Sequence, residues 1–423
     1  MAAMATVTNH AATADGLERV VAPAIGGSRD PRVWPEGLYV HLPFCAALCT
    51  YCDFASEVYS ADRPRRYLAA LEQDLSARID GLSALPSKEV AGDVLRFAPR
   101  TIFLGGGTPS ALSMAELKFF FEFLRRHVDC SRLEEFTIEA NPGSTDAAKL
   151  EFLLAQGINR ISFGVQSFQP HLLKLLGRVH GAAQGREAVA LARAAGFENL
   201  SIDLMHGLPT QSLDDLKRDL DEALELETEH LSAYGLIYED GTPLKAAVER
   251  GQIERLDPEQ EAAHYRLVME RLETGGLLQY EISNYARPGR EARHNLIYWR
   301  NEAYLGVGVS AASFVNFERT VNQYAMNAYM DAVERGEAPV ASRERLESEP
   351  RARESLILEL RLHAGVDPEE FRARWGLDLE APTIMPTLEK FRAVGLLEKS
   401  PEGRWRITRE GFPVADGILS ELV

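Results

Sequence analysis

The sequence predicts an α/β protein built on a parallel sheet, because short apolar runs alternate with longer amphipathic stretches from Gly37 onward. Polar residues close three of the apolar runs at the same end. The pattern then changes after Tyr238 and again near Pro350, so the 423-residue chain is expected to hold more than one domain. Six βα units in series imply a sheet with helices outside, either doubly wound or curled into a barrel.

The individual elements follow from the helical period of 3.6 residues and the strand period of two residues. The predicted strands are Leu38–Leu42, Thr101–Leu104, Glu135–Glu139, Arg160–Val165, Leu200–Met205 and His230–Leu236. The predicted helices are Arg66–Ile79, Met114–His127, Asp146–Ala155, Arg186–Ala195 and Leu213–Leu226. Ser144 before one helix, and Gly157 and Gly196 after two of them, support these boundaries.

Four parts are expected along the chain. Residues 1–33 are Ala- and Thr-rich, contain Gly26-Gly27 and lack an apolar h-region, so we expect a flexible tail and not a secretory signal. Residues 34–255 form the βα core, and residues 256–348 form a segment that covers it, with a helix over 257–275. Residues 349–423 are predicted to hold three helices and a short hairpin, a winged-helix-like α+β module.

Composition limits the function classes. The net charge of −17 disfavours a general nucleic-acid binder, which needs a basic face, and disfavours docking on anionic lipid by charge alone. No apolar run approaches the roughly 20 residues that span a bilayer. We therefore expect a cytoplasmic protein with no nucleic-acid partner and at most peripheral contact with a membrane.

Three of the four cysteines, Cys45, Cys49 and Cys52, fall within eight residues directly after the first strand. A disulfide framework would spread them along the chain, and Cys130 stands apart as a buried or incidental thiol. Structural zinc would take a fourth protein ligand, and His41, the nearby candidate, lies within the strand. An iron–sulfur cluster can leave one iron without a protein ligand, so the spacing favours a cluster, with zinc or a redox loop as alternatives.

Glu139, Gln166 and Asp203 each follow an apolar strand at its C-terminal end, and Gly105–Gly107 end another strand. In barrel-like α/β folds this edge carries the chemistry, although any one such residue could also be a loop starter or a helix cap. Glycines without a Cβ let backbone groups approach a ligand closely. The sequence therefore predicts a ligand site at this edge.

The spacing Cys-x3-Cys-x2-Cys after a strand resembles the signature of the radical S-adenosylmethionine superfamily. Tyr39-Val-His-Leu-Pro-Phe-Cys, Gly105-Gly-Gly-Thr-Pro, Glu139-Ala-Asn-Pro, Gly164-Val-Gln-Ser-Phe and Leu176-Gly-Arg resemble its oxygen-independent coproporphyrinogen oxidase branch, over the chain from about Tyr39 to its end. The resemblance implies a partial (β/α)6 TIM-like barrel, a [4Fe–4S] cluster on Cys45, Cys49 and Cys52, and S-adenosylmethionine at the open iron.

The resemblance also implies which residues contact the cofactor: Tyr39, Gly106, Gly107, Thr108, Glu139, Gln166, Arg178 and Asp203. Asp203 suits a ribose hydroxyl and Arg178 a carboxylate, because one accepts hydrogen bonds and the other offers a fork of donors. Tyr51 offers a face near the adenine, and Ile237, on the sixth strand, is a weaker match for an adenine-side contact.

Two activities compete within this branch. The oxidase carries a further cysteine two positions after the third, where this sequence has Phe54, and relatives with Cys-Asp-Phe resemble the HemW-type heme chaperones. His294-Asn-Leu-Ile-Tyr298-Trp299 matches their HNxxYW motif, so the resemblance implies heme contact by His294, Tyr298 and Trp299. A buried histidine and two aromatics under the barrel are the plainer alternative, and His180 and His206 are further candidates for the heme iron.

We therefore predict a heme chaperone that binds a [4Fe–4S] cluster, S-adenosylmethionine and heme, with porphyrin decarboxylation as the alternative and enzymatic turnover left open. The expected partners are heme-accepting proteins, respiratory ones among the candidates, and an electron donor; a homodimer is also open. A winged-helix regulator ranks lowest, because the arginines of the C-terminal module are interleaved with acidic residues.

Overall fold

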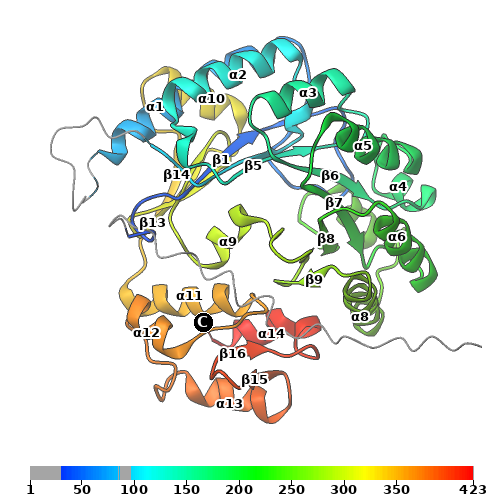
Figure 1. Cartoon of the computed structure of the whole chain (residues 1–423), viewed down its shortest axis with the longest axis vertical. Coiled ribbons are helices and arrows are strands. Elements are labelled where there is room, and N and C mark those ends of the chain that lie inside the picture. Colours follow the sequence, from blue (N-terminus) through cyan, green and yellow to red (C-terminus); the bar gives the residue numbers. More distant parts are fainter. Residues whose placement is uncertain (1–29, 84, 86–96, 423) are drawn as a thin grey trace, which may run out of the picture.

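The computed structural model describes residues 30–83, 85 and 97–422, so most of the predicted tail over 1–33 lies outside the described residues. Its centre is a twelve-stranded sheet in the order β14-β13-β12-β11-β1-β4-β5-β6-β7-β8-β10-β9 (Figure 1). The parallel strands are β11 (Tyr304–Val307), β1 (Gly37–Leu42), β4 (Thr101–Gly106), β5 (Glu135–Ala140), β6 (Arg160–Gln166), β7 (Leu200–His206) and β8 (His230–Gly235). This confirms the six strands that the sequence predicts and the α/β class.

Helices cover the outer face of this arc (Figure 1). They are α1 (Arg63–Leu82), α2 (Met114–His127), α3 (Ala147–Ala155), α4 (Pro170–Leu175), α5 (Ala182–Ala195), α6 (Leu213–Glu225) and α8 (Pro258–Thr274), whereas α7 (Pro243–Glu249) lies at the cysteine loop, where the N–H of Leu244 donates to the carbonyl of Thr50. Short 3-10 turns, η2 (Pro109–Ala111) and η3 (Cys130–Arg132), follow β4 and α2. The sequence predicts the start of α3 too early, because Asp146 and not Ser144 caps this helix by accepting from the N–H of Lys149.

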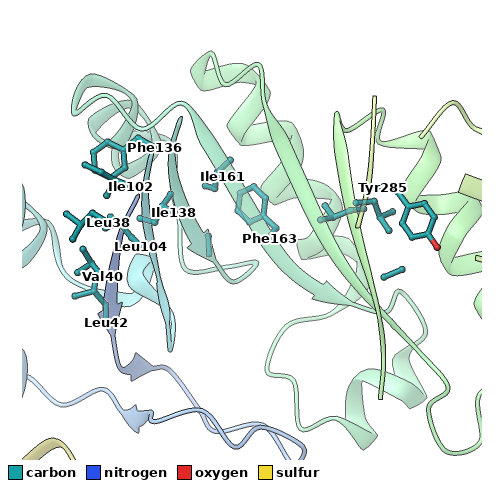
Figure 2. Packing of buried hydrophobic residues seen from close by; sticks show 14 of the residues in the cluster. Leu38, Val40, Leu42, Ile102, Leu104, Phe136, Ile138, Ile161, Phe163 and Tyr285 are labelled. Atoms are coloured by element: carbon teal, nitrogen blue, oxygen red, sulfur yellow. The ribbon is translucent and has the colours of Figure 1, made fainter. Parts of the chain in front are cut away.

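Strand alternation sorts the residues of β1 between two environments. Leu38, Val40 and Leu42 are fully or almost fully buried and point to one side of the strand, where they belong to the main apolar core (Figure 2). Tyr39 and His41 alternate with them and face the inside of the arc, where they line a cavity. The outer face therefore stabilises the fold, and the inner face carries the polar residues.

The predicted covering segment also extends the sheet itself. On one side β10 (Asn284–Ala286) pairs antiparallel with β8, and β9 (Leu278–Gln279) pairs with β10. On the other side β12 (Ala312–Val315), β13 (Glu318–Asn322) and β14 (Val340–Glu344) continue antiparallel from β11. The helices of this segment are α9 (Arg293–Trp299) and α10 (Met326–Glu334). The sheet is thus mixed and larger than six parallel strands.

The C-terminal residues form a separate layer on the far side of α9 (Figure 1). It consists of α11 (Ser348–Leu360), α12 (Pro368–Trp375), α13 (Met385–Ala393), the antiparallel pair β15 (Leu397–Lys399) and β16 (Trp405–Ile407), the turn η4 (Phe412–Val414) and α14 (Ala415–Ser420). Three helices and a hairpin match the predicted content, and α14 is an addition. An isolated bridge between Glu281 and Leu362 joins this layer to the barrel segment. Among the described residues, no helix has the length and apolarity needed to cross a membrane.

Candidate cofactor site and barrel floor

The cysteine loop is closed by a small parallel pair of strands at the C-terminal end of β1. Cys45 ends β2 (Phe44–Cys45), which pairs with β3 (Glu57–Val58), so Cys49 and Cys52 lie on the loop between the two. All three cysteines are half-buried and free of disulfides. Cys130 is exposed on η3, so of the two predicted alternatives, a buried or an incidental thiol, the structure excludes the buried one.

Hydrogen bonds fix this loop to the barrel. The N–H of Thr50 donates to the carbonyl of Leu176 (3.1 Å), and its hydroxyl donates to the carbonyl of Leu175 (2.9 Å), both at the end of α4. Side chains also donate to cysteine sulfur, among them Arg178 to Cys49 Sγ (3.2 Å) and Thr108 to Cys45 Sγ (3.7 Å). Such donors stabilise negative charge on sulfur, as a metal-bound thiolate requires.

The residues fit a cluster better than a single metal ion. His41 is committed elsewhere, because its Nε2 bonds the carbonyl of Ala55 (2.8 Å) and its Nδ1 bonds the hydroxyl of Tyr39 (3.1 Å). No three His, Cys, Asp or Glu side chains in the described part of the chain converge as the ligands of one ion would. In a [4Fe–4S] cluster each cysteine binds a different iron, so wider spacing is expected. Burial raises the pKa of Cys52 to about 11, so the charge of bound iron would have to favour the thiolate.

The turn after β4 requires glycine. Gly106 has φ of +109°, and a Cβ there would lie 2.6 Å from His41 Nε2, while a Cβ on Gly107 would lie 2.7 Å from the backbone of Pro43. The N–H of Gly106 donates to Glu139 Oε2 (3.2 Å), and the N–H of Thr108 donates to the carbonyl of Phe44 (2.8 Å). The turn therefore joins the cysteine loop to the carboxylate at the end of β5.

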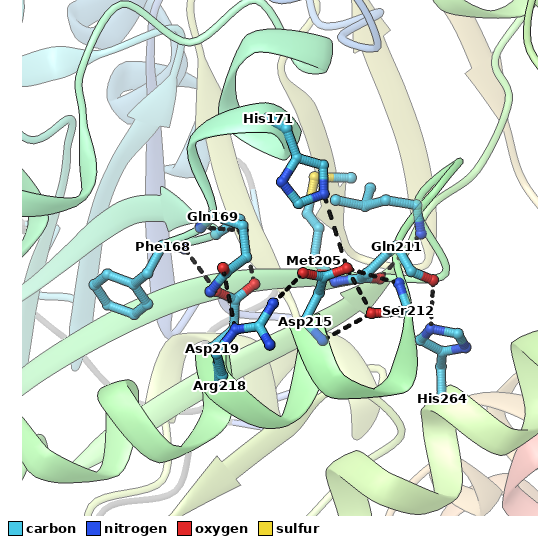
Figure 3. Close-up of polar contacts among 12 residues, drawn as sticks. Phe168, Gln169, His171, Met205, Gln211, Ser212, Asp215, Arg218, Asp219 and His264 are labelled. Carbon is cyan, nitrogen blue, oxygen red and sulfur yellow. Dashed lines mark hydrogen bonds and ion pairs between the residues drawn. The ribbon is translucent and has the colours of Figure 1, made fainter.

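Gln166 ends β6 in a left-handed conformation, with φ of +70°. The loop that follows is held by Asp219 of α6, whose carboxylate accepts from the hydroxyl of Ser167 (2.7 Å), the N–H of Phe168 (2.8 Å) and the amide of Gln169 (2.9 Å) (Figure 3). Three hydrogen bonds from one buried side chain fix the backbone where this predicted cofactor contact sits.

Two carboxylates face each other inside the arc. Burial, together with the nearby charge of Asp203, raises the pKa of Glu139 to about 8. Burial also raises the pKa of Asp203, while hydrogen bonds from Ser232 and Ser162 oppose that shift. At neutral pH the Glu139 carboxyl can therefore hold a proton while Asp203 accepts hydrogen bonds.

Asn141 is a site residue that was not singled out from the sequence, although it lies in the quoted Glu139-Ala-Asn-Pro motif. Its amide donates to the hydroxyl of Thr108 (2.7 Å), and its oxygen accepts from Arg178. Arg178 also donates to the carbonyl of Gly164 (2.5 Å). Asn141 thus connects the two side chains that contact the cysteine sulfurs.

A cavity of about 300 Å³ opens beside the cysteine loop. It is lined by Tyr39, His41, Asp53, Phe54, Ala55, Gly106, Glu139, Ser310 and Tyr324. Phe54 and Tyr324 are 65% and 61% exposed, and the hydroxyl of Tyr324 donates to the carbonyl of Asp53 (2.7 Å). Three predicted cofactor contacts, Tyr39, Gly106 and Glu139, therefore share one chamber.

Tyr51 and Ile237 are among the seven predicted contacts that do not line this chamber. Tyr51 packs against the apolar cluster of Leu172, Leu176, Met205 and Leu208. Ile237 is 67% exposed and lies on the loop beyond β8, which ends at Gly235, so its predicted place on the strand is wrong. Both nonetheless sit at the same end of the sheet as the cysteine loop, which we call the mouth of the barrel.

The HNxxYW motif lies at the opposite end, which we call the floor. It forms α9, and His294 is fully buried, with Nδ1 bonded to the hydroxyl of Thr101 (2.7 Å) and Nε2 to that of Tyr298 (2.8 Å). Thr101 is the first residue of β4, whose last residues form the glycine turn at the mouth. A six-residue strand spans roughly 17 Å, which sets the separation of the two ends.

A carboxylate from the barrel holds α9 in place. Glu135, the first residue of β5, accepts from the N–H of Arg293 (2.7 Å) and from the N–H of His294 (3.1 Å), in place of a local capping side chain. On the other face of α9 the Arg361 guanidinium lies 4.8 Å from the centre of the Trp299 ring. The motif therefore joins the barrel floor to the C-terminal module (Figure 1).

The two other histidines considered for heme lie toward the mouth. His180 is buried, with Nε2 bonded to the carbonyl of Val165 (3.1 Å), and it lines a second cavity of about 130 Å³ beside Cys49 and Arg178. His206 is buried beside Tyr265, and neither ring nitrogen has a hydrogen-bond partner among the described residues. Burial, with the nearby His264, lowers its pKa to about 3.

A parallel βα arc with three free cysteines on the loop after its first strand defines a protein of the radical SAM class. Residues 39–223 match the radical SAM superfamily, and residues 346–414 match the HemN C-terminal domain. The solved structure of coproporphyrinogen III oxidase (HemN) from Escherichia coli superposes with a TM-score of 0.78 at 25% identity, covering 93% of this chain and 91% of that chain. These matches confirm the predicted superfamily and fold class.

Curated relatives narrow the class. The heme chaperone HemW of Bacillus subtilis is 38% identical over 89% of this chain and 96% of its own length. The heme chaperones HemW of Mycobacterium tuberculosis and Escherichia coli are 36% and 34% identical, over 92% and 91% of this chain and 95% and 97% of their own lengths. The chain belongs to the HemW family.

Proposed function

We propose that this chain is a heme chaperone, which binds heme and delivers it to heme-accepting proteins. The observation that carries the proposal is the similarity to HemW heme chaperones over about nine-tenths of the chain. Phe54 supports it locally, because an exposed aromatic side chain lines the mouth cavity where the oxidase branch carries a further cysteine.

Cys45, Cys49 and Cys52 would hold a [4Fe–4S] cluster, and the mouth residues Tyr39, Gly106, Gly107, Thr108, Glu139, Gln166, Arg178 and Asp203 would hold S-adenosylmethionine. A cluster held there would supply one-electron chemistry when reduced by an electron donor. Arg178 and Thr108 direct donors at the cysteine sulfurs, and Asp203 offers an acceptor for a ribose hydroxyl. Tyr51, which lies on the cysteine loop and hydrogen-bonds Cys49, and Ile237 would contact the adenine side.

Heme would bind His294, Tyr298 and Trp299 at the floor. In the described arrangement both ring nitrogens of His294 are occupied and the ring is fully buried. An imidazole binds iron through a free nitrogen lone pair, so loading requires α9 to give up the hydrogen bond to Tyr298 or to Thr101. Binding at this motif is therefore coupled to opening of the floor.

The test is anaerobic reconstitution with iron and sulfide, followed by heme titration and a cofactor-cleavage assay on the same preparation. We expect saturable heme binding, little 5′-deoxyadenosine, and transfer of heme to an apo-acceptor. Decarboxylation of coproporphyrinogen III with stoichiometric cofactor cleavage would instead support the oxidase reading and overturn the chaperone proposal.

A further inference from the structure

Asn141 directly follows β5, and its side chain contacts two of the side chains that donate to cysteine sulfur. The orientation of its amide is fixed by these partners. Arg178 can only donate hydrogen bonds, so the amide oxygen must face Arg178 and the amide nitrogen must face the hydroxyl oxygen of Thr108, 2.7 Å away. The amide of Asn141 therefore accepts on one side and donates on the other.

The amide nitrogen determines where the hydroxyl proton of Thr108 points. The hydroxyl oxygen accepts from Asn141 Nδ2, so its own proton is free to point to Cys45 Sγ, which lies 3.7 Å from the oxygen. The backbone N–H of Thr108 is held separately by the carbonyl of Phe44 (2.8 Å). Asn141 thus positions the Thr108 hydroxyl as a donor to sulfur.

The amide oxygen acts on Arg178 in a similar way. The guanidinium Nη2 donates to Asn141 Oδ1 and to the carbonyl of Gly164 (2.5 Å), while Nη1 donates to Cys49 Sγ (3.2 Å). Because the guanidinium is planar and rigid, holding Nη2 also fixes the direction of Nη1. Asn141 therefore orients one donor toward Cys45 and a second donor toward Cys49.

Asn141 is itself held firmly in the turn that follows β5. Its N–H donates to the hydroxyl of Ser144 (3.1 Å), and that hydroxyl donates to the carbonyl of Asn141 (2.6 Å). The ammonium of Lys149 donates to the carbonyls of Ser110 (2.7 Å), Leu112 (3.1 Å) and Ser144 (3.1 Å), which ties this turn to the segment after the glycine turn. A residue anchored in this manner can impose a geometry on the side chains that it contacts.

We propose that Asn141 is a positioning residue that sets the reduction potential of the cluster held by Cys45, Cys49 and Cys52. The inference rests on the proposed cluster site and adds a residue that controls how easily the cluster is reduced. The reduced cluster carries one more negative charge than the oxidised cluster, and hydrogen bonds to cysteine sulfur stabilise negative charge. By directing donors at two sulfurs, Asn141 favours the reduced form and raises the potential.

The experiment measures the reduction potential of reconstituted full-length protein without S-adenosylmethionine, by a redox titration that follows the EPR signal of the reduced cluster. Asn141→Asp keeps the size of the side chain, but a carboxylate cannot donate, so the Thr108 hydroxyl should turn to it and leave Cys45 Sγ. At a fixed applied potential the ratio of reduced to oxidised cluster should fall about tenfold, which corresponds to about 59 mV for a one-electron couple. Asn159→Asp, which adds the same charge just before β6 at the floor, is the matched control and should keep the wild-type potential.

A double-mutant cycle separates positioning from the added charge. Thr108→Val removes the hydroxyl and should lower the potential by itself. Asn141→Asp should then have a smaller effect in the Thr108→Val background than in wild type, because the donor that it redirects is already absent. Asn141→Ala, which removes the amide without adding a charge, should also lower the potential.

The inference is overturned if Asn141→Asp and Asn141→Ala, with normal iron and sulfide content, both keep the wild-type potential. It is also overturned if Thr108→Val keeps that potential, a result that does not depend on whether the Asn141 variants fold. Additive effects of Asn141→Asp and Thr108→Val would assign the shift to charge alone and would overturn it as well. A wild-type chain that assembles no [4Fe–4S] cluster would contradict the proposed cluster site, and this inference with it.

Discussion

The mouth and the floor of this barrel are opposite in construction. The mouth presents free thiols, an open cavity and exposed aromatics, whereas the floor buries His294 completely within a closed set of hydrogen bonds. A solvent-exposed site can bind a cofactor without rearrangement. A site whose donors and acceptors are all hydrogen-bonded can bind a ligand only after some of those hydrogen bonds break. The comparison indicates that a heme bound at the floor would be admitted by a conformational step, whereas a cofactor bound at the mouth would need none.

The largest expected effect is loss of the cluster at the mouth without loss of heme binding at the floor. Cys49→Ala should abolish cluster assembly, measured as iron and sulfide content and the visible absorbance of the cluster, because the three thiolates would be its full protein ligand set. Heme affinity should stay close to that of wild type, since the floor shares no residue with the cysteine loop. Cys130→Ala, which changes the exposed cysteine on η3, is the control and should assemble a normal cluster. Loss of heme binding in Cys49→Ala would show that the ends are coupled.

The next effect falls on the floor. His294→Ala should abolish heme binding and lower the free energy of unfolding by about 3 kcal/mol, because two buried hydroxyls lose their partner and a cavity remains. Chemical denaturation and heme titration measure the two consequences. His171→Ala, which changes an exposed histidine on α4, should alter neither. Tight heme binding by the His294 variant would show that another residue, such as His180 or His206, ligates the heme iron.

Two buried groups, Glu139 at the mouth and His294 at the floor, should affect stability with opposite dependence on pH. The pKa of Glu139 is raised to about 8, so the folded state keeps a proton that the unfolded chain releases near pH 4.5, and stability falls as pH rises through this window. The pKa of His294 is lowered to about 3, so stability at the floor is lost as pH falls below about 6.5.

The free energy of unfolding of cluster-free protein, measured under reducing conditions from pH 4 to pH 9, checks both effects. Its loss at high pH is the alkaline limb of the curve and its loss at low pH is the acidic limb. Glu139→Gln should flatten the alkaline limb and leave the acidic limb unchanged. An unchanged alkaline limb in this variant would mean that another buried carboxyl, such as Glu281, carries the effect.

The smallest effect concerns the contact between α9 and the C-terminal module. Arg361→Ala should cost about 1 kcal/mol or less, the value of one cation–π pair, and should speed heme uptake because α9 is held less firmly. Stopped-flow absorbance measures the rate. Arg353→Ala, on α11 and paired with Glu349, is the control. Equal uptake rates in the two variants would contradict a gating role for this contact.

The sequence predicted six strands of the parallel arc, because each is a short, mainly apolar run in a βα alternation, but it did not predict β11, the parallel neighbour of β1. It did not predict the antiparallel extensions, since β9 and β10 have two and three residues and show no periodicity. The position of α9 at the floor of the barrel could not be predicted from the sequence either. A seven-residue helix carries no signal for which end of a barrel it covers, and the deciding partner is Glu135, more than 150 residues earlier.

The pairing of β1 with β11 has a consequence for synthesis. β1 is completed at Leu42, but its neighbour on one side is Tyr304–Val307, which leaves the ribosome about 270 residues later, roughly 15 to 50 seconds at bacterial elongation rates. During that interval one edge of an apolar strand has no partner and can pair with another chain. The same interval leaves the three thiols of the following loop on an unfinished barrel, so the order in which cluster assembly and edge closure occur would govern the yield of active protein in the cell.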